Sequence, residues 1–80
     1  MEQFTLINKQ RNRIKIFKKF KSTLPQAEEV IEIEYACVYK GSSKPVIKGS
    51  RIETLDKARE EYKELLAEGW MKTYIYNHFL

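Results

Sequence analysis

The sequence predicts a small α+β domain, in which a mainly antiparallel β-sheet of about four to five strands carries one amphipathic helix on one face. Three observations favour this class. Residues 30–40 alternate apolar and polar side chains, as a half-buried strand does. Residues 54–68 carry apolar side chains at helical spacing. Turn-forming residues separate the apolar stretches, and 80 residues suit one domain, so we expect residues 1–80 to fold as a single unit.

The first 20 residues predict a β-hairpin. Residues 4–8 are typical of a short strand, and the polar stretch 8–12 is typical of a turn into a second strand over residues 13–20. Period-two alternation in the second strand separates a basic face, which includes Phe17, from an apolar face. The apolar face holds Ile14, Ile16 and Phe20. We therefore expect the basic face to be solvated and the apolar face to meet the core.

The middle of the chain predicts a second hairpin. Residues 22–29 are typical of a loop, and residues 30–40 show the longest strand pattern of the chain. The odd positions of this strand are apolar, namely Ile31, Ile33, Tyr35, Cys37 and Tyr39. Turn-forming residues at 41–45 lead into a further strand over residues 46–52, with an irregularity expected at Gly49.

Residues 54–68 predict the amphipathic helix. Thr54 is an N-cap residue, and Gly69 suits the left-handed position that follows a helix. The apolar stripe of the helix consists of Leu55, Ala58, Tyr62, Leu65 and Leu66. We expect this stripe to pack on the sheet through Ile14, Ile16, Ile31, Ile33 and Tyr35. Trp70 should fold back onto the stripe, and a short aromatic strand over residues 74–76 should complete the sheet.

The composition is that of a globular protein, with 42% hydrophobic and 32% charged residues. The single cysteine, Cys37, excludes an internal disulfide and lies in a strand pattern, so we expect a structural role in a reducing compartment. No apolar stretch is long enough for a membrane span or resembles a signal peptide. These features predict a cytoplasmic protein.

Residues that commonly act as catalytic groups or metal ligands are too few to predict an active site. The one histidine lies far along the chain from the one cysteine. Glu32 and Glu34 share one strand face. We expect them to form ion pairs across the sheet, with Arg13 and Lys15, rather than to act as catalytic carboxylates. The glycines match no phosphate-binding loop. The sequence therefore predicts no catalytic, cofactor or metal site, and no small-molecule substrate.

The stretch 11–21 interleaves cations with aromatic residues, a pattern that can follow a phosphate backbone and stack bases. The candidate face for an anionic partner consists of Arg11, Arg13, Lys15, Phe17, Lys19 and Lys21. The alternative interpretation is a solvated strand face whose cations pair with acids of the next strand and discourage aggregation. A net charge of +4 is a smaller positive charge than dedicated nucleic-acid-binding proteins usually carry, which favours this alternative.

Aromatic residues also gather near the C-terminus. The candidate docking patch for a protein partner consists of Tyr74, Tyr76, His78 and Phe79. The alternative is that aromatic side chains fill the core between helix and sheet, and we expect this of Tyr62 and Trp70.

Part of the chain resembles a known family. The shared pattern consists of Lys48, Arg51, Thr54, Ala58, Tyr62, Leu65, Leu66, Gly69 and Trp70. Across residues 46–72 the chain is similar to a domain-of-unknown-function family of small cyanobacterial proteins, whose helix ends in Leu-Leu-x-x-Gly-Trp. Tyr62 stands where that family often has tryptophan, and the N-terminal region here lacks the family's early tryptophan. The resemblance implies a photosynthetic bacterial or cyanophage origin. It implies no functional residue, because the family has no assigned activity.

The sequence as a whole favours a non-enzymatic interaction protein, which binds another protein or a second copy of itself through a sheet edge or through the C-terminal aromatics. The alternative hypothesis is a nucleic-acid-binding module that uses residues 11–21. An exposed apolar patch or self-association would support the first hypothesis, and a continuous basic face would support the second.

Overall fold

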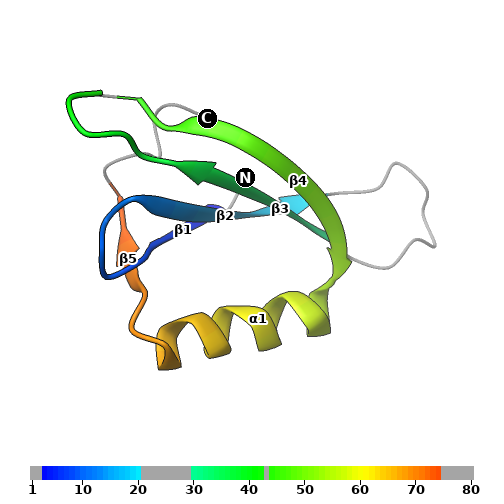
Figure 1. Ribbon diagram of the computed structural model, residues 1–80. Coiled ribbons are helices and arrows are strands. Elements are labelled where there is room, and N and C mark those ends of the chain that lie inside the picture. The colour runs from blue at the N-terminus through cyan, green and yellow to red at the C-terminus, as the bar shows by residue number, and fades with distance from the viewer. Residues whose placement is uncertain (1–2, 21–29, 43, 75–80) are drawn as a thin grey trace.

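A computed structural model describes residues 3–20, 30–42 and 44–74 of the chain. Its elements, in chain order, are β1 (Gln3–Ile7), β2 (Arg13–Phe20), β3 (Val30–Cys37), β4 (Val46–Thr54), α1 (Leu55–Ala67) and β5 (Met71–Thr73). Within these residues the five strands form one antiparallel sheet, and α1 packs against one of its faces (Figure 1). The predicted α+β class is therefore confirmed.

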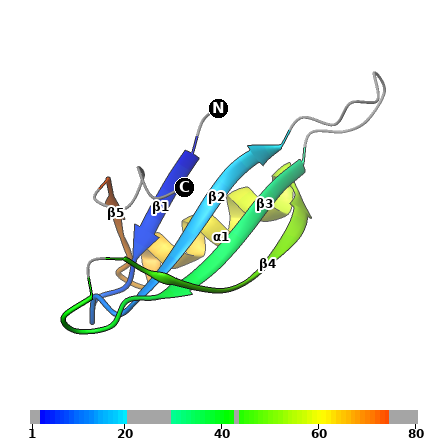
Figure 2. The ribbon, with the colours of Figure 1, turned by 90° about the horizontal axis from the view of Figure 1, so that it is seen from above.

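The strand order across the sheet is β4-β3-β2-β1-β5. The first four strands follow one another as an antiparallel meander, and α1 then carries the chain back across the sheet (Figure 2). β5 pairs with the free side of β1. β4 and β5 are consequently the two edge strands, and β2 lies in the centre.

The turn between β1 and β2 is held by two asparagines. The Oδ1 atom of Asn8 accepts hydrogen bonds from the backbone N–H groups of Asn12 and Arg13, at 2.9 and 3.0 Å. The side chain of Asn8 also donates to Oδ1 of Asn12. Arg11 adopts a φ of 59°, the left-handed conformation that a tight turn needs. The polar stretch 8–12 is therefore the turn that the sequence predicts.

Both ends of α1 are capped as the sequence predicts. Oγ1 of Thr54 accepts a hydrogen bond from the backbone N–H of Lys57 at 3.4 Å. At the other end Gly69 has a φ of +103°, a conformation that favours glycine. The N–H of Gly69 donates to the carbonyl of Leu66 and the N–H of Trp70 donates to that of Leu65, which is a Schellman motif. The helix therefore stops where Trp70 can turn back onto the core.

Replacing Thr54 with alanine should lower the free energy of unfolding by about 0.5–2 kcal/mol, because the cap hydrogen bond is lost at an exposed helix start. Thr54→Ser keeps the hydroxyl oxygen and serves as the matched control. Urea denaturation followed by circular dichroism measures both variants. An equal loss in the two variants would show that the hydroxyl of Thr54 does not cap the helix.

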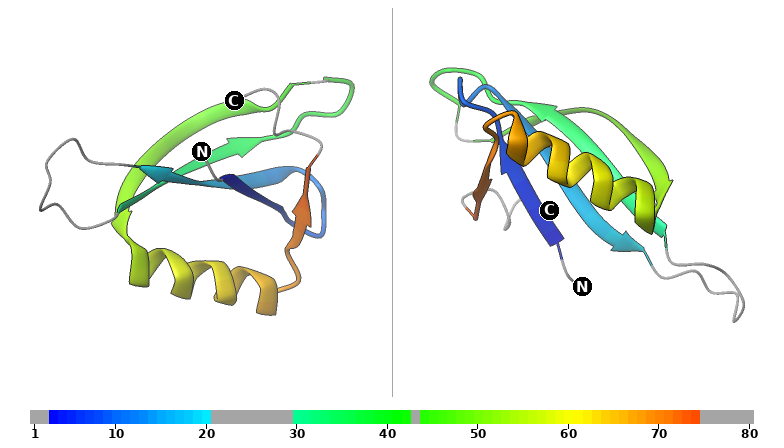
Figure 3. Two further views of the ribbon diagram at one scale, coloured as in Figure 1. Left: turned by 180° about the vertical axis from the view of Figure 1, so that it is seen from behind. Right: turned by 90° about the horizontal axis from the view of Figure 1, so that it is seen from below.

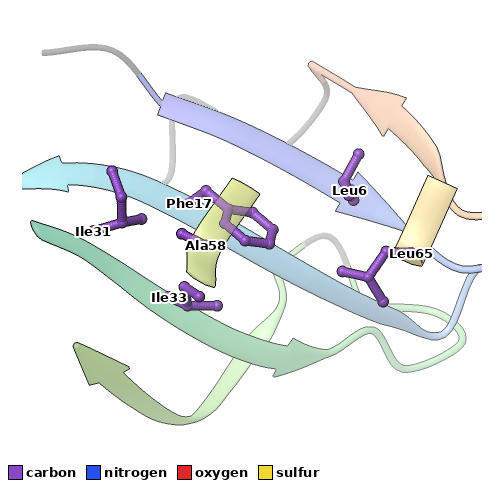
Figure 4. Close-up of a cluster of buried hydrophobic side chains, with 6 residues drawn as sticks. All are labelled: Leu6, Phe17, Ile31, Ile33, Ala58 and Leu65. Atoms are coloured by element: carbon purple, nitrogen blue, oxygen red, sulfur yellow. The ribbon is translucent and has the colours of Figure 1, made fainter. Parts of the chain in front are cut away.

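Two hydrophobic clusters lie on the two faces of the sheet. We call the face that meets α1 the helix face and the opposite one the distal face. The cluster on the helix face consists of Leu6, Phe17, Ile31, Ile33, Ala58 and Leu65 (Figure 4), with Leu55, Tyr62 and Trp70 packed against it. The cluster on the distal face consists of Ile7, Ile14, Ile16 and Ala36, with Val38 packed against it. The sheet therefore buries apolar side chains on both faces.

The predicted assignment of faces in β2 is wrong. Phe17 was expected on a solvated basic face, but it is 5% exposed and its ring contacts that of Tyr62 on α1 at a centroid distance of 5.5 Å. Ile14 and Ile16 were expected beneath the helix and lie on the distal face instead. The reason is that β2 is the central strand and carries large apolar residues at both even and odd positions, and therefore on both faces of the sheet. Period-two alternation separates its faces without saying which one the helix covers.

The predicted pairing between β2 and β3 is also wrong. Cα pairing places Lys15 opposite Tyr35 and Arg13 opposite Cys37. Among the described residues, Lys18 of β2 forms an ion pair with Glu34 of β3. Tyr35, which was expected in the core, is 42% exposed. The register is decided by the burial of Ile31 and Ile33 against α1, which outweighs the small energy of half-exposed ion pairs.

The predicted irregularity at Gly49 is confirmed. Tyr35 pairs with Gly49 but Ala36 pairs with Ile47, so Lys48 is an extra residue in β4. A Cβ atom at Gly49 would lie 2.4 Å from the hydroxyl oxygen of Tyr35, so a larger residue here would require the Tyr35 side chain to move.

Some predicted boundaries differ from the structure. The last strand is β5 at Met71–Thr73, earlier than the aromatic strand predicted over residues 74–76, of which only Tyr74 is described. The strand predicted over residues 30–40 ends at Cys37. The loop predicted over residues 22–29 lies outside the described residues. The described part of the chain contains no helix that is long and apolar enough to cross a bilayer.

Candidate binding groove

A groove of about 720 Å³ opens between α1 and the sheet. Seen from the helix side, α1 crosses the sheet diagonally and β1 lies to one side of it (Figure 3). The residues that line the groove are Phe4, Phe17, Lys19, Ile31, Leu55, Ala58, Arg59, Tyr62, Lys63 and Lys72. They come from four strands and the helix. The volume falls in the range that proteins use for small ligands.

The floor of the groove is apolar and rich in aromatic rings. We define the floor as Phe4, Phe17, Ile31, Leu55, Ala58 and Tyr62. The ring of Tyr62 meets those of Phe17 and Phe4 edge to face, at centroid distances of 5.5 and 6.2 Å. Phe17 is buried, whereas Phe4 is 42% exposed, so the part of the floor formed by Phe4 is open to solvent. The floor thus offers a ligand hydrocarbon and aromatic surface.

The rim of the groove is basic. We define the rim as Lys19, Arg59, Lys63 and Lys72. Arg59 and Lys63 are four residues apart on α1 and therefore point to the same side of the helix. Nζ of Lys72 lies 5.0 Å from the centroid of the Phe4 ring, within the range of a cation–π contact. No acidic side chain is found among the described residues that line the groove.

Three of the rim cations, Arg59, Lys63 and Lys72, differ from Lys15, Lys18 and Arg51 in how their charge is balanced. Glu61 of α1 forms ion pairs with Lys15 of β2, at 3.7 Å, and with Arg51 of β4. Arg51 also pairs with Glu53 at 3.2 Å, and Lys18 pairs with Glu34. Within the described parts of the chain, no carboxylate lies at salt-bridge distance from the side chains of Arg59, Lys63 and Lys72. These three cations therefore have no direct ion-pair partner among the described residues.

The structure does not gather the predicted anion-binding face into one surface. Arg11 and Arg13 are exposed at and beside the hairpin turn. Lys15 is engaged with Glu61, and its Nζ also lies 5.9 Å from the ring of Trp70. Phe17 and Lys19 line the groove. Lys21 lies outside the described residues. The expected continuous solvated face is thus interrupted by the helix that packs on it.

The predicted docking patch is described only at Tyr74, which is 70% exposed. Tyr76, His78 and Phe79 lie outside the described residues. Trp70 and Tyr62 pack against the helix-face cluster, and this part of the prediction is confirmed.

Sequence reasoning missed four lining residues, namely Phe4, Arg59, Lys63 and Lys72. One local signal was present, because Arg59 and Lys63 are two cations at helical spacing in an otherwise acidic helix. Lys72 contributes to the basic surplus of the chain, and Phe4 gives no signal of a site. Phe4 reaches the groove through the pairing of β1 with β2, and Lys72 reaches it through the pairing of β5 with β1.

Outside the groove, the described residues offer few groups that could form a second site. A hydrogen bond with Tyr39 raises the pKa of Lys48 above its ordinary value, and Nζ of Lys48 lies 5.4 Å from the Tyr39 ring centroid. This pair lies on an exposed surface and has no further charged partner in the described residues. The Cys37 thiol is half-buried and free. Among the described residues no group of three histidine, cysteine or acidic side chains is placed to hold a metal ion.

Comparison with protein-family models, with curated proteins and with solved structures finds no match to this chain. The resemblance of residues 46–72 to a cyanobacterial family stays a prediction. The functional argument for this protein therefore rests on the groove itself.

Proposed function

We propose that this protein is a non-enzymatic binding protein and that the groove between α1 and the sheet binds an anionic partner. One observation carries the proposal. Three cations of the rim, Arg59, Lys63 and Lys72, surround an apolar floor and have no carboxylate partner in the described residues, whereas Lys15, Lys18 and Arg51 are all paired.

The physical basis is the charge balance of the site. Like charges that surround a concave apolar surface repel one another, and their field is screened less there than on an open surface. An anion that enters the groove relieves this repulsion and gains the attraction of several cations at once. The surrounding charges therefore favour a negatively charged partner and disfavour a positively charged one.

The proposed site keeps the predicted non-enzymatic binding role but differs in partner and in location. The sequence favours binding of another protein through a sheet edge or through the C-terminal aromatics, of which only Tyr74 is described. β4 is an edge strand with exposed Ile47 and Ile52. However, β4 also carries a bulge with Lys48 as the extra residue, and both features are devices by which edge strands avoid pairing. The groove has no comparable obstacle, so we place the binding function there.

A pair of fluorescent probes tests the proposal. 1-Anilinonaphthalene-8-sulfonate carries an aromatic body and one negative charge, and N-phenyl-1-naphthylamine has nearly the same body without charge. We expect the folded protein to bind the sulfonate more tightly. The double variant Arg59→Glu with Lys63→Glu should weaken sulfonate binding by about tenfold or more, which corresponds to roughly 1.4 kcal/mol. It should leave binding of the neutral probe nearly unchanged.

The matched control changes the same net charge away from the groove. Lys40 and Lys57 are exposed and do not line it, so the variant Lys40→Glu with Lys57→Glu should bind the sulfonate nearly as the unmodified protein does. Urea denaturation should show that both double variants remain folded. Equal weakening in the two variants, or equal weakening of the two probes, would contradict a site at the rim.

A further inference from the structure

We infer that the ligand of the groove is a single-headed anionic amphiphile, with an unbranched hydrocarbon tail on the floor and an acidic head at the rim. The inference rests on the proposed function, because it names the chemical class of the anion. Fatty carboxylates and lipids with an anionic headgroup share this chemistry.

The floor determines the nature of the tail. Among its six residues the hydroxyl of Tyr62 is the only side-chain hydrogen-bonding group. A nucleobase or a peptide that lay on this surface would lose water from several polar groups without gaining protein partners in exchange. A hydrocarbon chain has no polar group to desolvate. The floor therefore favours an acyl tail over a nucleic acid or a peptide.

The arrangement of the floor also favours an unbranched tail. The buried rings and side chains of Phe17, Ile31 and Ala58 form its deeper part, and Phe4 forms the part open to solvent. A tail that starts at the exposed ring of Phe4 can continue along the half-buried side chains of Tyr62 and Leu55 and remain in apolar contact. Each methylene that becomes buried should tighten binding by about three- to fourfold.

The rim determines the nature of the head. Arg59 presents a planar guanidinium, which binds a carboxylate or phosphate through two parallel hydrogen bonds. Lys63 is on the same side of α1, and Lys72 reaches the groove from β5, with its Nζ beside the ring of Phe4. One acidic head between these groups neutralises charges that otherwise repel one another. The charge of the ligand is therefore expected on its head, and its tail is uncharged.

Displacement of bound 1-anilinonaphthalene-8-sulfonate tests the inference. Sodium octanoate, decanoate and dodecanoate are compared below their micelle-forming concentrations. We expect competition to strengthen by about three- to fourfold for each added methylene until the groove is filled. Decyltrimethylammonium has a similar tail and the opposite charge, and it should compete at least tenfold less well than decanoate. The variant Arg59→Glu with Lys63→Glu should weaken decanoate and not decyltrimethylammonium.

Two further experiments are needed. Binding to vesicles distinguishes a lipid headgroup from a free carboxylate, and competition by an oligonucleotide or a peptide tests the other classes of anion. Binding to phosphatidylglycerol vesicles but not to phosphatidylcholine vesicles, with weak binding of monomeric carboxylates, would support the amphiphile and assign it to a lipid headgroup. Stronger competition by a ten-nucleotide oligothymidylate or by a glutamate-rich peptide, together with no chain-length dependence, would overturn the amphiphile and leave the proposed function standing. A sulfonate probe that fails to bind the groove, with no competition by any anion, would overturn both.

Discussion

Replacing Phe17 with alanine should lower the free energy of unfolding by about 3–5 kcal/mol. Phe17 is 5% exposed and lies in the helix-face cluster, where its ring contacts that of Tyr62. The total stability of a domain of 80 residues is roughly 4 to 12 kcal/mol, so the substitution removes a large part of it. Urea denaturation followed by circular dichroism, with Trp70 fluorescence as a second probe, measures the loss.

Phe4→Ala is the matched control for this prediction. The two rings are cross-strand neighbours and both meet Tyr62, but Phe4 is 42% exposed. Its removal should cost about half as much or less, since the hydrophobic contribution scales with the area removed from water. If the two variants lose equal stability, or if Phe17→Ala is nearly neutral as for a solvated strand residue, the helix does not pack on Phe17.

Replacing Ile16 with alanine should lower the free energy of unfolding by about 2–5 kcal/mol. Ile16 is fully buried in the distal-face cluster, beside Ile7, Ile14 and Ala36. Loss of its side chain leaves a cavity on the face of the sheet that does not meet α1. The same denaturation experiment measures the effect, and circular dichroism of the native state shows whether the helix persists.

Ile52→Ala is the control on the distal face. Ile52 lies in β4 opposite Glu32 and is 54% exposed, so its truncation should cost less than about 1 kcal/mol. Comparable losses for Ile16 and Ile52 would show that the distal-face cluster is not a true core. Large losses for both Phe17 and Ile16 would show that the central strand is buried on its two faces.

The elements of this protein are largely predictable because their signals are local. The alternation of residues 30–40, the asparagine turn before Arg13 and the caps at Thr54 and Gly69 each depend on residues that are close in sequence. Hydrogen bonds and backbone conformations within a few residues determine them. The predicted helix over residues 54–68 accordingly agrees with α1 and its N-cap residue.

The candidate site is less predictable because its residues come from distant segments. Arg59 and Lys63 lie on one helix, but Phe4 and Lys72 meet only through the pairing of β1 with β5. The basic stretch of β2 was the conspicuous feature of the sequence, yet α1 covers its helix face and Glu61 engages Lys15. A run of cations does not reveal which of them will find carboxylates once the sheet and helix pack.

Local sequence patterns are sufficient to predict the number and type of most elements, the helix and its caps, the bulge beside Gly49 and the α+β class. Three features depend on packing between distant segments: the face of β2 that meets the helix, the alignment of β2 with β3, and the set of cations around the groove. The physical reason is the range of the interactions. Turns, caps and periodicity act within a few residues, whereas the choice of face and register depends on the burial of side chains that are far apart in the chain.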